Sequence, residues 1–179
     1  TRIDEVLQAA KEAELRCVTR IDSEVLLLEI YDLWQPRIQE SGGTLRLEIS
    51  SFLFNGDEEL LKDAIGNLLS NTIKYRNPRK RLRCILSAEA RGNWLEVSVS
   101  DNGLGVPTID RKRIFQRFVR VEGHNRGYSG GHGLGLSFVQ DAAIAHNGNV
   151  KCVDGLDGGA KFIFRIPITQ AKKKKGEHS

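Results

Sequence analysis

Two asparagines and a lysine fall on one face of a predicted helix. Asn67, Asn71 and Lys74 are spaced at i, i+4 and i+7, and this spacing places their side chains in one stripe. An amide oxygen is a hard, neutral ligand that suits Mg²⁺ together with water and phosphates. A lysine ammonium can contact a terminal phosphate as a point charge. The stripe predicts a metal and phosphate site, and the alternative interpretation is a solvated helix face.

An aspartate followed by two glycines ends a predicted strand. Asp101 is followed by Gly103 and Gly105. A carboxylate accepts hydrogen bonds, and adenine offers an amine donor where guanine offers an oxygen acceptor. Asp101 on the floor of a pocket would therefore select adenine, and the glycines would let the backbone approach the base. The alternative interpretation is an Asx turn at the end of a strand.

A second glycine-rich segment comes directly before another predicted helix. Gly131, Gly133, Leu134 and Gly135 belong to this segment, and exposed N–H groups at a helix N-terminus attract phosphate oxygens. The Rossmann motif needs a βαβ unit, and the Walker motif needs a Gly-Lys-Ser/Thr ending; the sequence has neither. Taken in order, the three segments predict an ATP site that has no P-loop.

Two arginines lie between the aspartate motif and the second glycine segment. Arg117 and Arg120 accompany Phe115 and Phe118. We expect the aromatic rings to anchor this segment on the core while the arginines project from it. An arginine can spread the charge of a phosphoryl group in a transition state. The alternative interpretation is a pair of solvated surface arginines.

The composition is that of an ordinary globular domain. The chain has 179 residues, of which 40% are hydrophobic and 28% are charged, so it is long enough for one domain with a core. No apolar run approaches the roughly 20 residues that span a membrane. The three cysteines form no C-x-x-C pair, which argues against zinc and predicts free, buried thiols. The basic runs at 76–83 and 172–175 lack interleaved aromatic residues, so nucleic-acid binding is not predicted.

The hydrophobic periodicity predicts an order of elements in which strands and helices do not alternate regularly. Helices are expected over 3–16, after Asp22, from Asp57 toward Pro78 and over 135–146, with a short one at 110–119. The helix after Asp22 is expected to use Val25, Leu26, Leu28, Ile30 and Leu33 as its apolar positions. Strands are expected near 44–49, 81–90, 94–100, 149–154 and 160–167. This order favours an α+β fold, a two-layer sandwich with helices on one face of a mostly antiparallel sheet.

These motifs resemble the catalytic ATP-binding domain of bacterial sensor histidine kinases, within the GHKL ATPase superfamily. The N box of that family resembles residues 67–75, its first G box residues 101–105 and its F box residues 114–118. Its later glycine boxes resemble residues 131–136 and 155–160. The resemblance covers about residues 25–167, with five boxes in the family's order.

The resemblance implies a Bergerat-type sandwich that holds Mg-ATP under a lid at about residues 120–132. It implies that Asn71 ligates magnesium, that Asn67 supports the metal and phosphates and that Lys74 contacts the phosphates. It further implies that Tyr75 flanks the base, that Asp101 reads adenine and that Arg117, with Arg120 as a second candidate, faces the γ-phosphate. The glycines of the two boxes, with Leu134, complete the predicted nucleotide-binding set. Thr72 replaces the usual alanine of the N box.

Family kinases phosphorylate a histidine on a dimerising helical hairpin that precedes this domain. Residues 1–16 are expected to be the tail of that hairpin, residues 17–168 the catalytic domain and residues 169–179 a basic disordered tail. The expected partners are the dimerisation helices and a response regulator, and the expected location is cytoplasmic, without membrane insertion by this fragment. The alternatives are another GHKL ATPase, such as an anti-sigma-factor serine kinase, or a regulatory ATP-binding module without phosphotransfer.

Overall fold

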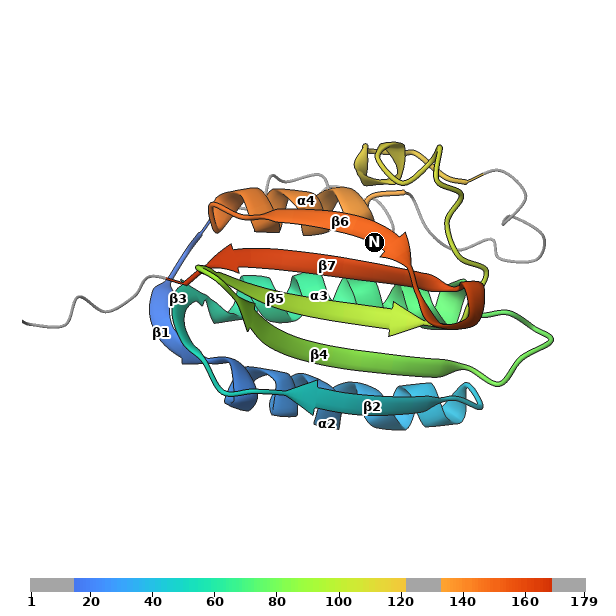
Figure 1. The fold of residues 1–179 in the computed structure, drawn as a ribbon, viewed down its shortest axis with the longest axis horizontal. Coiled ribbons are helices and arrows are strands. Elements are labelled where there is room, and N and C mark those ends of the chain that lie inside the picture. The colour runs from blue at the N-terminus through green and yellow to red at the C-terminus, as the bar shows by residue number, and fades with distance from the viewer. Residues whose placement is uncertain (1–14, 122–132, 169–179) are drawn as a thin grey trace, which may run out of the picture.

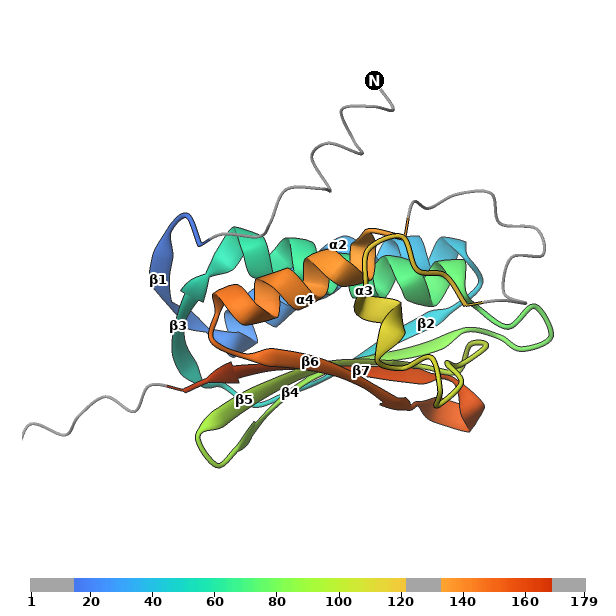
Figure 2. The ribbon, with the colours of Figure 1, turned by 90° about the horizontal axis from the view of Figure 1, so that it is seen from above.

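The computed structural model describes residues 15–121 and 133–168, which form two sheets and three α-helices. The strands are β1 (Val18–Asp22), β2 (Thr44–Ile49), β3 (Leu53–Asp57), β4 (Arg83–Arg91), β5 (Trp94–Asp101), β6 (Asn149–Asp154) and β7 (Ala160–Pro167). The α-helices are α2 (Ser23–Glu40), α3 (Glu58–Lys74) and α4 (Gly135–Ala145). All three helices lie on one face of the larger sheet (Figures 1 and 2). The predicted two-layer α+β sandwich is confirmed.

The larger sheet has the order β2-β4-β5-β7-β6. The β2–β4 pair is parallel and the other three pairs are antiparallel, as expected for a mostly antiparallel sheet. A second sheet, β1–β3, lies at one end of the molecule (Figure 1). Strands β1 and β3 were not predicted from the sequence, because both are only five residues long and neither shows clear polar–apolar alternation.

Helix α2 begins where it was predicted but buries a different face. The Asp22 carboxylate caps it by accepting a hydrogen bond from the Glu24 N–H at 2.8 Å. Its buried apolar side chains are Leu26, Leu27, Ile30 and Ile38. The predicted apolar positions Val25, Leu28 and Leu33 are exposed, so that part of the prediction is wrong. The run of apolar residues contains two possible stripes, and packing against the sheet and α3 selects one of them.

Helix α3, which carries the predicted metal and phosphate residues, is fixed at both ends. The Asp57 carboxylate caps its start by accepting from the Leu60 N–H at 3.1 Å, and Tyr75 is its C-cap. The inner face of α3 is buried through Leu61, Ala64, Ile65, Leu68 and Leu69. The asparagine–lysine stripe therefore lies beside this apolar face and leaves the core intact.

The start of α3 is also joined to α4 and to the residues that precede β1. The second Asp57 oxygen accepts the N–H groups of Arg16 and Cys17 at 2.6 and 3.0 Å. Burial alone would raise the pKa of the Asp57 carboxyl, but the N–H groups of Cys17, Arg16 and Leu60 stabilise the carboxylate and leave its pKa below the ordinary value. The buried His146 ring accepts the Asp57 N–H at Nε2, 3.0 Å, and therefore donates from Nδ1 to the Ala142 carbonyl at 2.8 Å.

The remaining predictions have mixed outcomes. The segment 110–119 forms only a short 3₁₀ turn at Arg113–Phe115. Cys84 and Cys152 are buried as predicted, but Cys17 is exposed. The expected helix over 3–16, the loop and lid within 120–132 and the basic tail lie almost wholly outside the described residues. Leu15 and Arg16 are described and lie outside any helix. Within the described ranges, the helices are too short or too polar to cross a membrane.

Candidate functional site

Two adjoining cavities open between α3, the start of α4 and the sheet. The Asp101 cavity is lined by Asp101, Val106, Ala160, Phe162 and neighbouring apolar side chains. The Asn67 cavity is lined by Asn67, Ser70, Lys74, Gly133 and Gly135. Asn71 and Tyr75 line both cavities. Together the two cavities join an apolar recess to a polar one.

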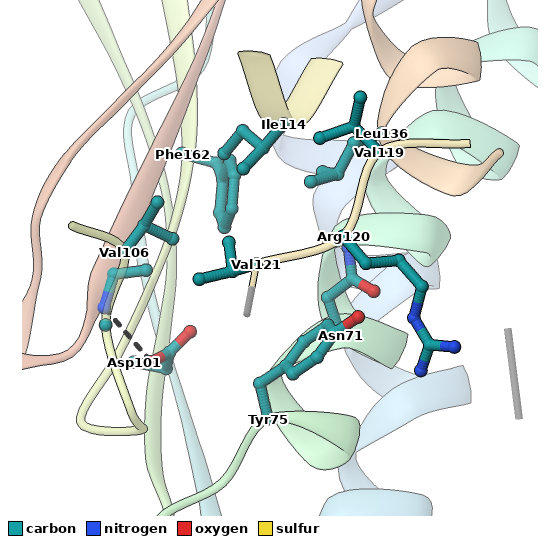
Figure 3. Close-up of a pocket in the computed structure, with 12 residues that line it drawn as sticks. Asn71, Tyr75, Asp101, Val106, Ile114, Val119, Arg120, Val121, Leu136 and Phe162 are labelled. Carbon is teal, nitrogen blue, oxygen red and sulfur yellow. Dashed lines mark hydrogen bonds between the residues drawn. The ribbon is translucent and has the colours of Figure 1, made fainter. Parts of the chain in front are cut away.

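Asp101 lies at the floor of the first cavity, at the C-terminal end of β5. Its carboxylate points into the space between Tyr75 and Phe162 (Figure 3). Oδ1 accepts the N–H groups of Gly103 at 2.8 Å and Ala160 at 3.2 Å. No side chain or backbone group of the described residues donates to Oδ2, which remains as an acceptor facing the cavity.

Two features of its environment shift the pKa of the Asp101 carboxyl in opposite directions. The residue is 6% exposed, and this burial raises the pKa of its carboxyl above the ordinary value. The N–H groups of Gly103 and Ala160 oppose that effect by stabilising the carboxylate. A buried acidic group with one oxygen fully bonded and one oxygen facing a cavity is suited to binding a donor on a ligand.

The two glycines after Asp101 let protein backbone segments pack closely. A Cβ at Gly103 would lie 2.5 Å from the Tyr75 carbonyl oxygen, and one at Gly105 would lie 2.4 Å from the Gly158 carbonyl oxygen. Gly105 also has a φ of +70°, which disfavours residues with a side chain. The glycines therefore let protein backbone segments approach one another around the cavity. Gly105 lines the Asp101 cavity, whereas Gly103 does not.

The predicted stripe on α3 forms one wall of the Asn67 cavity. Asn67 donates from Nδ2 to the Asp63 carbonyl at 3.0 Å, and its Oδ1 faces Gly135, where a Cβ would lie only 3.0 Å away. Asn71 projects into the region shared by both cavities (Figure 3). The Lys74 ammonium lies 5.0 Å from the centre of the Tyr75 ring. The structure thus brings all four predicted residues to one site.

The start of α4 closes the Asn67 cavity. Gly133 and Gly135 line it, and Leu134, the N-cap residue, is buried and lines neither cavity. No side-chain bond caps α4 within the described part of the chain, so its first N–H groups remain as donors. The Phe118 N–H donates to the Gly133 carbonyl at 3.0 Å, which joins the chain before residue 122 to the chain after residue 132. Gly131 lies outside the described residues.

The two arginines are placed differently. Arg120 lines the Asp101 cavity beside Asn71, with its guanidinium on the side away from Asp101 (Figure 3). Arg117 lines neither cavity, and its guanidinium lies 3.3 Å from the Asp141 carboxylate on α4. In this structure Arg120, which was the second candidate, is therefore nearer to the expected ligand positions than Arg117.

Most of the apolar lining was missed by sequence reasoning. Val106, Ile114, Leu136 and Phe162 line the Asp101 cavity, but each reads as an ordinary core residue in sequence. Asn102 was also missed, because its role depends on contacts distant in the chain. It is 3% exposed, accepts the Arg83 N–H at 2.8 Å and donates to the Arg81 carbonyl at 2.9 Å. Asn102 therefore fastens the end of β5 to the start of β4, and so supports Asp101.

Comparison with known families and proteins is consistent with this site. Residues 56–170 match the family described as histidine kinase-, DNA gyrase B-, and HSP90-like ATPase. The chain is 38% identical over 112 residues to the sensor-like histidine kinase SenX3 of Mycolicibacterium smegmatis, covering 63% of this chain and 29% of that protein. It is 39% identical over 120 residues to the sensor protein CiaH of Streptococcus pneumoniae, covering 66% of this chain and 27% of that protein. The chain thus spans less than a third of either relative.

Solved structures give the same picture of the fold. The crystal structure of full-length ShkA in complex with AMPPNP matches with a TM-score of 0.78 and 31% identity, covering 94% of this chain and 35% of that chain. The nucleotide-free catalytic domain of the histidine kinase ThkA matches with a TM-score of 0.74 and 24% identity. That match covers 86% of this chain and 99% of the ThkA domain.

Proposed function

Because the chain belongs to the family of histidine kinase-, DNA gyrase B- and HSP90-like ATPases, we propose that it is the catalytic domain of a sensor histidine kinase. In this proposal residues 17–168 bind Mg-ATP and transfer its γ-phosphoryl group to a histidine on dimerisation helices outside this chain. The phosphoryl group would then pass to an aspartate of a response regulator. The observation that carries the proposal is the Asp101 carboxylate in an apolar cavity that adjoins a polar cavity on α3.

The Asp101 cavity suits adenine by shape and by hydrogen-bonding chemistry. Asp101 Oδ2 would accept the exocyclic amine of adenine, whereas guanine would present an oxygen to the same oxygen. Val106, Ile114 and Phe162 supply an apolar surface against which a flat base can pack. Tyr75, at the end of α3, would flank the base from the opposite side of the cavity (Figure 3).

The Asn67 cavity suits the phosphates. The N–H groups at the uncapped start of α4 offer donors and the positive end of a helix dipole. Lys74 adds a mobile positive charge on the α3 side, and Arg120 adds one beside Asn71. Arg120 would face the phosphoryl group that is transferred, with Arg117 available if its contact with Asp141 opens. These groups act by orienting and neutralising the triphosphate.

Magnesium fits the residues that are present. Asn71 offers a hard amide oxygen in the region shared by both cavities, and Mg²⁺ is commonly held by few protein ligands, phosphates and water. No group of three or more acidic, histidine or cysteine side chains that could hold a metal unaided is found in residues 15–121 and 133–168. When bound, magnesium would neutralise charge on the phosphates. Asn67 would support the same region through its Oδ1.

The proposed partners follow from the relatives. SenX3 and CiaH are named as a sensor-like histidine kinase and a sensor protein, and full-length ShkA was crystallised with AMPPNP. We infer that the partners of this chain are ATP, the dimerisation helices of the full-length protein and a response regulator, on the cytoplasmic side of a membrane. The domain boundaries that we propose are those expected above, with residues 1–16 leading from the helical hairpin.

The proposal is tested by calorimetry and by phosphotransfer. In the presence of Mg²⁺ the chain is expected to bind a non-hydrolysable ATP analogue and to bind the corresponding GTP analogue at least about tenfold more weakly, since a mismatched polar contact costs about 1–3 kcal/mol. Labelled ATP is expected to give the full-length protein an acid-labile, alkali-stable phosphoryl group, as phosphohistidine is. Equal affinity for both nucleotides, or an acid-stable phosphoester, would contradict the proposal.

A further inference from the structure

A half-buried guanidinium outside the predicted boxes connects two parts of the Asp101 cavity. Arg111 lies in the segment between β5 and the 3₁₀ turn, and its side chain is only 20% exposed. Its Nε donates to the carbonyl oxygen of Val106 at 3.0 Å, and its Nη2 donates to the Asp154 carboxylate at 2.6 Å. The Arg111 side chain thus bonds both to Val106, five residues earlier in its own segment, and to Asp154 at the end of β6.

Both partners of Arg111 lead to the cavity. Val106 lines the cavity directly. Asp154 is paired in register with Ala160 across β6 and β7, and the Ala160 N–H donates to Asp101 Oδ1. Arg111 therefore joins the wall formed by Val106 to the strand pair that holds the carboxylate on the cavity floor.

The geometry points to Arg111 as a positioning residue of the Asp101 cavity: we propose that it sets the place of Val106 relative to Asp101 and so the affinity for the adenine base. This inference rests on the proposed function. Arg111 does not line either cavity, so it acts through Val106 and Asp154 and touches no ligand itself.

The chemistry of the contact favours a geometric role over one in overall stability. The Asp154 side chain is 82% exposed, and ion pairs with an exposed partner contribute little to folding. A planar guanidinium can serve a carbonyl and a carboxylate in two directions at fixed angles, whereas an ammonium has a single centre. Removing Arg111 should therefore loosen one wall of the cavity and leave the melting temperature close to that of the wild type.

The test compares nucleotide affinities of variants of the chain by calorimetry with Mg-ATP analogue and Mg-ADP. Arg111→Ala is expected to lower the affinity for both nucleotides by the same factor, on the order of tenfold. The factor is the same because the displaced cavity wall contacts the adenine base, which both nucleotides share. Arg111→Lys keeps one of the two bonds, so its nucleotide affinity should lie between those of Arg111→Ala and the wild type. Arg113→Ala is the matched control, since the Arg113 side chain is 58% exposed and forms an ion pair with Asp110 of its own segment, at 3.3 Å.

Asp154→Ala tests the same connection from its exposed end, where folding is not at risk. Asp154→Ala should lower the affinity for both nucleotides less than Arg111→Ala does. The double variant Arg111→Ala/Asp154→Ala should bind them no more weakly than Arg111→Ala alone. Equal affinities in Arg111→Ala and Arg113→Ala, or a loss that affects ATP but spares ADP, would overturn the inference while leaving the proposed function standing. A wild-type chain that binds no adenine nucleotide would overturn the proposed function and the inference with it.

Discussion

Asp101 on β5 and Ala160 on β7 are bonded through one oxygen of the Asp101 carboxylate, 3.2 Å from the Ala160 N–H. The same oxygen also accepts the Gly103 N–H at 2.8 Å. The protein therefore holds the carboxylate from one side only. The other oxygen is directed to the cavity by bonds that involve no ligand, so the acceptor is in place before a base arrives.

Asp101→Asn should reverse this polarity without unfolding the domain. The amide oxygen can replace Oδ1 and keep both backbone bonds, which turns the NH₂ group toward the cavity and places a donor against the adenine amine. We expect ATP affinity to fall by a cost of about 1–3 kcal/mol, measured by calorimetry, with a melting temperature near the wild type. Asp101→Ala is the comparison variant and should also lose thermal stability. Unchanged ATP affinity in Asp101→Asn would refute the assignment.

Asn71→Ala should abolish phosphotransfer by the full-length protein and leave its melting temperature near that of the wild type. The side chain lines the cavities and lies outside the aliphatic face of α3, so truncating it leaves no core cavity. Activity is measured with labelled ATP over a range of magnesium concentrations. A collapse in melting temperature, or full activity with magnesium, would mean that Asn71 is structural.

Arg120→Ala should reduce phosphotransfer more than Arg117→Ala does. Arg120 lines the Asp101 cavity beside Asn71, while Arg117 is paired with Asp141. An arginine that stabilises a transferring phosphoryl group contributes about 10³–10⁵ in rate in other phosphotransfer enzymes, so a loss of at least about tenfold is expected for Arg120→Ala. Single-turnover rates at saturating ATP measure it. The opposite ranking would return the role to Arg117.

The sequence predicted much of the site because its chemistry is local. The spacing of Asn67, Asn71 and Lys74 along one helix already implies a shared face, and the structure places all three on the Asn67 cavity. Asp101 was likewise predicted from its position at a strand end. The resemblance to the GHKL superfamily, which rested on these boxes, is confirmed by the family match.

Contacts between distant segments could not be predicted in this way. The bond from Arg111 to Asp154 spans 43 residues, and no local pattern indicates it. The choice between two apolar stripes on α2 depends on what packs against that helix, so the sequence alone did not show that Leu28, one of its apolar positions, is 42% exposed. The packing of Gly103 against the Tyr75 carbonyl was likewise not predicted, because only the fold brings that carbonyl to Gly103.

Gly66→Ala should stabilise the domain. Gly66 is buried in the interior of α3, where glycine costs about 0.5–1 kcal/mol relative to alanine. A Cβ added there would lie 3.5 Å from Trp34 of α2, an ordinary packing distance. The melting temperature, measured by calorimetry, is expected to rise by about 2–4 °C for each 1 kcal/mol of added unfolding free energy. Gly103→Ala is the contrasting variant and should destabilise, because its Cβ would lie 2.5 Å from the Tyr75 carbonyl oxygen.

Asp57 should make folding stability sensitive to acid. Burial raises the pKa of its carboxyl, but the backbone hydrogen bonds from Cys17, Arg16 and Leu60 outweigh burial, so the pKa is lowered in the folded state. A carboxyl with a lowered folded pKa contributes stability that is present above its unfolded pKa and is lost as pH falls through its folded pKa. Asp63, whose pKa burial raises, acts with the opposite sign, so the comparison is made against Asp57→Asn. The difference in unfolding free energy between wild type and Asp57→Asn should shrink on going from pH 7 to below pH 3.8; a constant difference would contradict this role.

The two bonds from Arg16 and Cys17 to Asp57 have a mechanical consequence. Asp57 is also the cap of the helix that carries Asn67, Asn71 and Lys74. A displacement of the backbone at residues 16 and 17 would therefore act first on the first turn of α3. The β1–β3 ladder lies alongside and resists such a displacement as a second attachment. Residues 16 and 17 are therefore attached directly to the N-terminus of α3, the helix that carries the candidate metal and phosphate ligands.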